Sequence, residues 1–113
     1  MTTHTLTGQN LIDGQWVGSD PKTTRAVNPA TGAVLEPGFH AATTDEIERA
    51  FTAAMSAYAA TRDLPATRWA DLLDAIADQI MALGDQLLTT GQNETALPSA
   101  RLTGERARTT GQL

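Results

Sequence analysis

The hydrophobic periodicity of the chain changes at Thr43, and this change constrains the fold more than any other feature of the sequence. After this residue, apolar side chains recur every three or four residues, which places them on one face of an α-helix. Thr43 and Glu46 have the spacing of a capping box, in which each side chain accepts a hydrogen bond from the other residue's free backbone N–H. We therefore predict an amphipathic helix that starts at Thr43, with an apolar stripe formed by Ile47, Ala50, Phe51, Ala54, Met55 and Tyr58.

A longer apolar stripe follows the interruption at Leu64-Pro65 and predicts a second amphipathic helix. Its members are Trp69, Leu72, Leu73, Ile76, Ala77, Ile80, Leu83, Leu87 and Leu88. Pro98 separates it from a third segment, residues 99–113, which is polar and less periodic. This segment reaches Leu113 without the usual signals for the end of a helix. We expect a third helix cut short there, and hence the amino-terminal piece of a longer protein.

The residues before Thr43 predict β-hairpins. Asp13-Gly14 suits a type I′ turn between short apolar runs at Leu11–Val17. A second hairpin is expected around Asn28–Gly32, because Pro29 presets a turn angle and Gly32 relieves the turn. The expected organisation is a loose tail in 1–9, two hairpins in 10–37 and helices in 43–113, all within one incomplete domain spanning 1–113.

Composition excludes several classes of function. The net charge is −5, which is unfavourable for binding a phosphate backbone, so we expect no nucleic acid as a partner. The chain has no cysteine, which excludes disulfides, thiolate metal sites and a cysteine nucleophile within it. No apolar run is long enough to span a bilayer and the N-terminus lacks the pattern of a signal peptide. We expect a cytoplasmic protein without a membrane partner.

Three stretches together resemble the start of an aldehyde dehydrogenase. They are Ile12-Asp13-Gly14-Gln15-Trp16-Val17, then Val27-Asn28-Pro29-Ala30-Thr31-Gly32, and then a helix pair that opens with Arg68-Trp69-x-x-Leu72-Leu73 and closes with Glu94-Thr95-Ala96-Leu97-Pro98. Residues 97–113 are similar to the branch that acts on 2-oxoglutarate semialdehyde, the 2,5-dioxopentanoate dehydrogenases. Ala96 departs from the pattern, since the family usually carries Gly after Glu-Thr, and Gly permits backbone angles that Ala resists.

The resemblance implies an α/β parent enzyme that oxidises a small aldehyde with NAD or NADP. In such enzymes a cysteine thiolate attacks the aldehyde, and a glutamate acts as general base in the hydrolysis of the thioester. The family places these groups, and the residues that bind the dinucleotide, beyond Leu113. The resemblance therefore implies no catalytic and no cofactor-binding residue in this chain, which alone would be inactive and bind no cofactor. The parent would be a homodimer or homotetramer.

The candidate substrate-binding residue is Arg108. The suspected substrate carries a carboxylate, which arginine binds through a bidentate fork. The resemblance places this helix near the substrate entrance, so one of Arg101, Arg106 and Arg108 could hold the carboxylate, and our choice among them is Arg108. The competing interpretation is a solvated basic helix face on which Glu105 pairs with Arg108.

His4 and His40 lack clustered ligands, so we predict no metal site and expect both to be ordinary surface or turn residues.

An alternative to the enzyme interpretation stays open. Two amphipathic helices could also form a stand-alone protein-interaction module derived from a dehydrogenase. Such a module would bind a partner helix instead of contributing to an enzyme.

Overall fold

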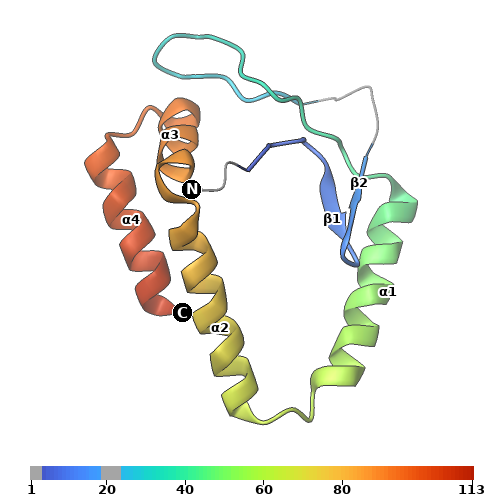
Figure 1. Cartoon of the computed structure of the whole chain (residues 1–113). Helices are drawn as coiled ribbons and strands as arrows, with labels where there is room; N and C mark the ends of the chain where they lie inside the picture. The colour runs from blue at the N-terminus through green and yellow to red at the C-terminus, as the bar shows by residue number, and fades with distance from the viewer. Residues whose placement is uncertain (1–3, 19–23) are drawn as a thin grey trace. The chain divides into compact units, whose positions relative to one another are not determined.

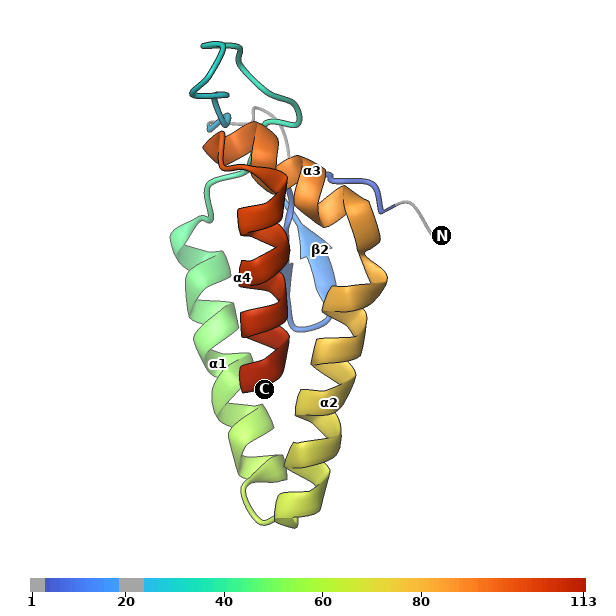
Figure 2. The ribbon, with the colours of Figure 1, turned by 90° about the vertical axis from the view of Figure 1, so that its left-hand side faces the viewer.

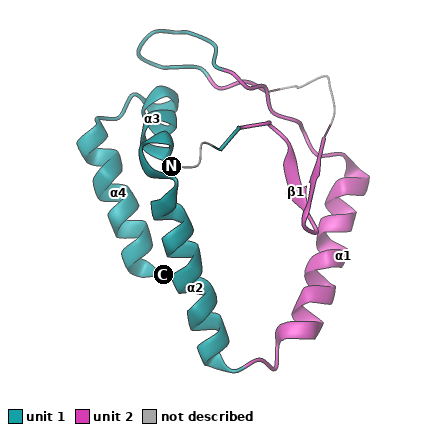
Figure 3. Ribbon diagram, in the orientation of Figure 1, with its two compact units in different colours: residues 1–5, 27–35, 65–113 teal, residues 6–26, 36–64 magenta. Residues whose placement is uncertain are grey.

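The computed structural model describes residues 4–18 and 24–113 of the chain. They form two compact units, coloured separately in Figure 3. Unit 2 contains the described residues of 6–26 and 36–64, and unit 1 contains those of 1–5, 27–35 and 65–113.

Unit 2 contains the predicted first hairpin. Strands β1 (Asn10–Ile12) and β2 (Gln15–Val17) are antiparallel, with Leu11 opposite Trp16. Asp13 and Gly14 have φ values of 51° and 73°, which are the two positive angles that a type I′ turn requires. The prediction for Leu11–Val17 is therefore confirmed. Ile12 is the one buried apolar side chain among the described residues, with 7% of its surface exposed.

Helix α1 (Thr44–Thr61) completes unit 2 and lies against β1, as Figure 1 shows. Both hydrogen bonds of the predicted capping box are present: Thr43 Oγ1 accepts from the Glu46 N–H, and Glu46 Oε2 accepts from the Thr43 N–H. These two bonds satisfy amides that the first turn of a helix leaves without partners.

The predicted second hairpin is reduced to isolated bridges, which is a correction. In unit 1, Val27 pairs with Val34 alone, and the Asn28 N–H donates to the Ala33 carbonyl at 2.8 Å. In unit 2, Thr24 pairs with Phe39. Pro29 and Pro37 have no N–H to donate, so a ladder cannot extend through either residue.

Unit 1 contains α2 (Ala66–Ala82), α3 (Gly84–Thr95) and α4 (Ser99–Gln112). The expectation of one continuous helix through Leu88 is wrong, because Gly84 adopts φ 57° and breaks the helix after Ala82. Glycine reaches this angle without the steric cost that a Cβ adds. Figure 2 shows α4 running beside α2. The third predicted helix is confirmed as α4.

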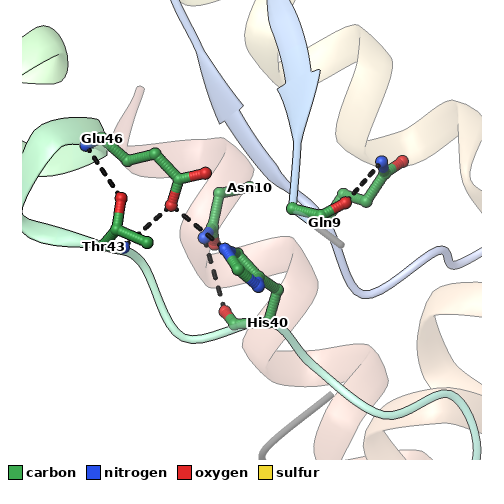
Figure 4. Close-up of polar contacts among 6 residues, drawn as sticks. Gln9, Asn10, His40, Thr43 and Glu46 are labelled. Atoms are coloured by element: carbon green, nitrogen blue, oxygen red, sulfur yellow. Dashed lines mark hydrogen bonds and ion pairs between the residues drawn. The ribbon is translucent and has the colours of Figure 1, made fainter. Parts of the chain in front are cut away.

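A polar cluster extends the cap of α1 to the preceding loop and to β1 (Figure 4). His40 Nε2 lies 3.1 Å from Glu46 Oε2, the same oxygen that accepts the Thr43 N–H. The Asn10 side-chain amide donates to the His40 carbonyl at 3.4 Å. The side chains of His40 and Glu46 are only 12% and 15% exposed. The sequence predicts a surface or turn residue at His40; it lies in the loop before α1, and its largely covered side chain also contacts the cap.

The pKa of Glu46 is lowered from its ordinary value of 4.5, first by the hydrogen bond from the Thr43 N–H and then by the hydrogen bond with His40. Because the pKa of Glu46 is lower in the folded state, its carboxylate stabilises the first turn of α1 at pH values above 4.5. That stabilisation is lost as the pH falls through the lowered folded pKa.

Acidification should open the start of α1 in a manner that depends on Glu46. We expect the Ile47 amide, which donates to the Thr43 carbonyl, to lose hydrogen-exchange protection as the pH falls below 4.5. Glu46→Gln should be less protected at neutral pH and should lack this acid-dependent loss. The matched control Glu48→Gln should retain it. Parallel loss of protection in the wild type and Glu46→Gln, measured by NMR, would contradict the assignment.

Ala96 forms the C-terminal cap of α3 in the left-handed conformation, with φ 58° and ψ 16°. Its N–H donates to the Gln92 carbonyl at 2.9 Å. A left-handed backbone costs a residue with a Cβ about 1–2 kcal/mol, and only part of this is offset by the greater entropy that glycine loses on folding. The departure noted in the sequence at this position therefore carries a real conformational cost.

Replacing this residue should stabilise the end of α3. We expect Ala96→Gly to raise the local free energy of opening by about 0.5–1 kcal/mol, since glycine removes the steric cost of the positive φ. Amide exchange in the last turn of α3 should slow accordingly. Ala107→Gly, within the regular part of α4, should instead lower protection in its own helix by a similar amount. Faster exchange at α3 in Ala96→Gly would refute the explanation.

Candidate functional site

Helix α4 carries the candidate residue and is held in unit 1 by α2 and α3. It begins directly after Pro98, whose ring cannot sit inside a helix but suits its start. Leu102 faces α3 at Gly91, where a methyl group built on the glycine would lie 3.5 Å from Leu102 Cδ1. A methyl group there would make only an ordinary van der Waals contact, so the packing of α3 and α4 does not require glycine at this position.

The three arginines of α4 have different surroundings. Arg101 Nε lies 2.8 Å from Glu105 Oε1, an ion pair between residues one helical turn apart. Arg106 Nη1 donates to the Gly84 carbonyl at 3.0 Å. Arg108 is exposed and makes no ion pair within residues 4–18 and 24–113. The expected pair between Glu105 and Arg108 is wrong, because Glu105 is engaged by Arg101.

Arg106 has a structural role that the sequence did not reveal. Its guanidinium binds a backbone carbonyl at the break between α2 and α3, 22 residues earlier in the chain. A hydrogen bond from a charged donor is stronger than one between neutral groups. No local pattern marks such a contact, because it depends on how α4 folds back along the other helices.

Arg108 is the arginine of α4 whose guanidinium forms no hydrogen bond or ion pair with the described residues. Arg108 presents five N–H donors at the exposed surface of α4, and an unengaged fork of this kind can bind a carboxylate bidentately. The geometry therefore leaves Arg108 as the suitable anion-binding side chain of α4. Its role toward a substrate remains a prediction.

His4 forms hydrogen bonds through its backbone N–H and carbonyl, and its ring forms no hydrogen bond or ion pair in the described part of the chain. The His4 N–H donates to Gln86 Oε1 at 2.9 Å, and Gln86 Nε2 donates back to the His4 carbonyl. Within the described residues, no three His, Asp or Glu side chains come close enough to hold a metal ion. None of the helices in that part of the chain is long and apolar enough to cross a membrane.

Among the described residues, three grooves stand out, of which two are lined mainly by apolar residues and one by polar residues. In unit 2, a groove of about 670 Å³ runs along the polar side of α1 beside Asp13, and one of about 380 Å³ lies where α1 meets Ile12. In unit 1, a groove of about 410 Å³ follows the apolar residues of α2 beside His4. Among the hydrogen bonds of the described residues, none joins a Ser or Thr hydroxyl in these grooves to a base, and we assign no catalytic residue to them.

The sequence of this chain is similar to that of known proteins over most of its length. The model of the aldehyde dehydrogenase family matches residues 16–113. Alpha-ketoglutaric semialdehyde dehydrogenase 2 of Azospirillum brasilense is 45% identical over 96% of this chain and 21% of its own length. Alpha-ketoglutaric semialdehyde dehydrogenase of Acinetobacter baylyi is 38% identical over 94% of this chain and 20% of its own. No solved structure gives a significant match.

The chain therefore spans about a fifth of the length of the curated relatives that it matches. The family match begins within the hairpin at Trp16 and continues through α4. It includes the turn at Asn28–Gly32, the helices of both units and Arg108, whereas residues 12–15 of the first stretch that carries the resemblance lie outside it. The chain belongs to the aldehyde dehydrogenase family.

Proposed function

We propose that this chain is the amino-terminal portion of an NAD(P)-dependent aldehyde dehydrogenase that oxidises 2-oxoglutarate semialdehyde to 2-oxoglutarate. The observation that carries the proposal is the 45% identity to the Azospirillum enzyme over nearly the whole chain. The second relative bears the same substrate in its name. The parent would be a cytoplasmic homodimer or homotetramer acting on a small aldehyde, as the resemblance implies.

The reaction would consume an aldehyde, water and oxidised NAD(P), and would release a carboxylate, reduced NAD(P) and protons. The dinucleotide would supply the hydride acceptor. The 113 residues contain no cysteine to act as the nucleophile that the resemblance implies. The sequence also has no run with the G-x-G-x-x-G spacing of a dinucleotide cradle. We therefore assign no residue here to the cofactor and infer that the chain alone is inactive.

Arg108 would bind the distal carboxylate of the substrate. Arg101 and Arg106 each use one donor group within unit 1, the Arg101 Nε–H toward Glu105 and the Arg106 Nη1–H toward the Gly84 carbonyl. Arg108 is exposed on the same helix and retains its fork. An exposed arginine gains most from a carboxylate when the surrounding polypeptide excludes water from the pair.

A stand-alone interaction module is the second candidate, and the exposed apolar side chains favour it. Phe51, Met55 and Tyr58 on α1 are each about two-thirds or more exposed. Contiguous exposed apolar patches often mark surfaces that bind another protein. The two proposed functions predict different activities for a fused protein. A stand-alone module joined to the rest of a dehydrogenase would not support aldehyde oxidation.

A chimaera tests the enzyme proposal directly. This chain would replace the matching fifth of the Azospirillum enzyme, and the product would be assayed with 2-oxoglutarate semialdehyde and either NAD or NADP. We expect NAD(P)H formation by the chimaera and none by the 113-residue chain, because the remaining polypeptide carries the nucleophile. A soluble, folded chimaera without aldehyde oxidation would refute the enzyme proposal and favour the module.

Substituting Arg108 tests its assignment. In the active chimaera, Arg108→Ala should raise KM for 2-oxoglutarate semialdehyde about tenfold or more, since a hydrogen bond to a charged group contributes about 1.5–3 kcal/mol. KM for an uncharged aldehyde of similar length should stay unchanged. Arg101→Ala, on the same helix, serves as the control. An unchanged KM for the charged substrate in Arg108→Ala would remove the assignment.

A further inference from the structure

We propose that Arg106 is a positioning residue for the proposed reaction: it fixes the rotation of α4 about its own axis and thereby holds Arg108 toward the substrate carboxylate. The inference rests on the proposed function, in which Arg108 binds that carboxylate. It adds a residue that acts through Arg108, and it extends the candidate site to the break between α2 and α3.

The hydrogen bond between Arg106 and Gly84 is the first observation. Arg106 Nη1 donates to the Gly84 carbonyl at 3.0 Å, in partly buried surroundings. A charged donor forms a stronger hydrogen bond than a neutral one, and the bond gains further where the surroundings are less polar than water. This contact therefore ties the middle of α4 to the start of α3.

Leu102 marks the same side of α4 as Arg106. Four residues turn an α-helix by about 400°, so these two side chains point within about 40° of each other. The Leu102 side chain lies against α3 at Gly91, and both Leu102 and Arg106 are partly buried. One apolar and one polar contact thus hold this side of α4 against its neighbours in unit 1.

Arg108 lies on the other side of the helix. Two residues turn an α-helix by about 200°, so Arg108 points away from Arg106, and it is exposed. Its guanidinium ends far from the helix axis, so a rotation of α4 displaces this group more than it displaces the backbone. Two parallel hydrogen bonds to a carboxylate depend on direction as well as on distance. The anchor at Arg106 therefore bears on the affinity of Arg108 for a carboxylate.

The other polar side-chain contacts of α4 leave its rotation free. Arg101 pairs with Glu105, and the threonine hydroxyls of α4 donate to carbonyls about one turn earlier, all within the same helix. Such bonds move with the helix when it turns. Among the side-chain hydrogen bonds of the described residues, the one from Arg106 joins α4 to another helix.

A double-mutant cycle in the chimaera tests the positioning. The measured quantity is the ratio of KM for 2-oxoglutarate semialdehyde to KM for an uncharged aldehyde of similar length. We expect Arg106→Ala to raise this ratio about threefold or more, and to raise it no further when added to Arg108→Ala, because both act through one contact. The control Arg101→Ala removes a bond within α4 only and should leave the ratio unchanged.

Amide exchange in the 113-residue chain tests the anchor without any enzyme assay. Arg106→Ala should speed exchange at residues 106–112 about tenfold, since it removes a hydrogen bond from a charged donor. Arg108→Ala should leave these rates unchanged, because Arg108 forms no ion pair with the described residues. Equal rates in Arg106→Ala and the wild type would overturn the anchor, whether or not the chimaera is active.

The kinetic outcomes separate the positioning from the proposed function. If Arg108→Ala raises the KM ratio and Arg106→Ala does not, the positioning is overturned and the proposed function stands. Additive effects of the two substitutions would mean that Arg106 acts independently of Arg108, which also overturns the positioning. A folded chimaera that does not oxidise the aldehyde refutes the proposed function, and the role of Arg106 toward a substrate falls with it.

Discussion

The packing of β1 against α1 is the interaction on which unit 2 depends. Ile12 lies where the two elements meet and is the single buried apolar side chain among the described residues. The cap at Thr43 and Glu46 fixes the start of the helix beside it, and His40 joins the preceding loop to the same carboxylate. The orientation of α1 thus rests on one apolar contact and a small set of polar ones, with little apolar burial to reinforce them.

This scarcity of burial explains the exposed apolar faces. Helices α1 and α2 contain no buried residue, although their sequences carry regular apolar stripes. Helices in proteins gain most of their stability from packing an apolar face, since propensity alone is weak over such lengths. Exposed apolar stripes therefore indicate helix surfaces that further polypeptide can cover. We propose that this polypeptide is the rest of a dehydrogenase.

Local sequence patterns predicted the secondary-structure elements of this chain better than they predicted the contacts between its residues. Asp13-Gly14 specified the first turn and Thr43-x-x-Glu46 specified the cap, because both devices act within four residues. Gly84 broke a stripe that looked continuous, since hydrophobic periodicity does not report a positive φ. The bond from Arg106 to Gly84 and the contact of His40 with Glu46 could not be predicted, because each depends on the folded path of the chain. For the candidate site, the sequence indicated the basic helix and the structure left Arg108 as its available cation.

The central claim is that the apolar faces of this chain need further polypeptide to be covered, and scanning calorimetry of the 113 residues tests it most directly. A self-sufficient domain of this length should unfold in one transition, with a heat-capacity change of about 1.5 kcal/mol/K and equal calorimetric and van't Hoff enthalpies. The account predicts a broad, weak transition with a much smaller heat-capacity change. One sharp transition with the full change would contradict it and favour a finished interaction module.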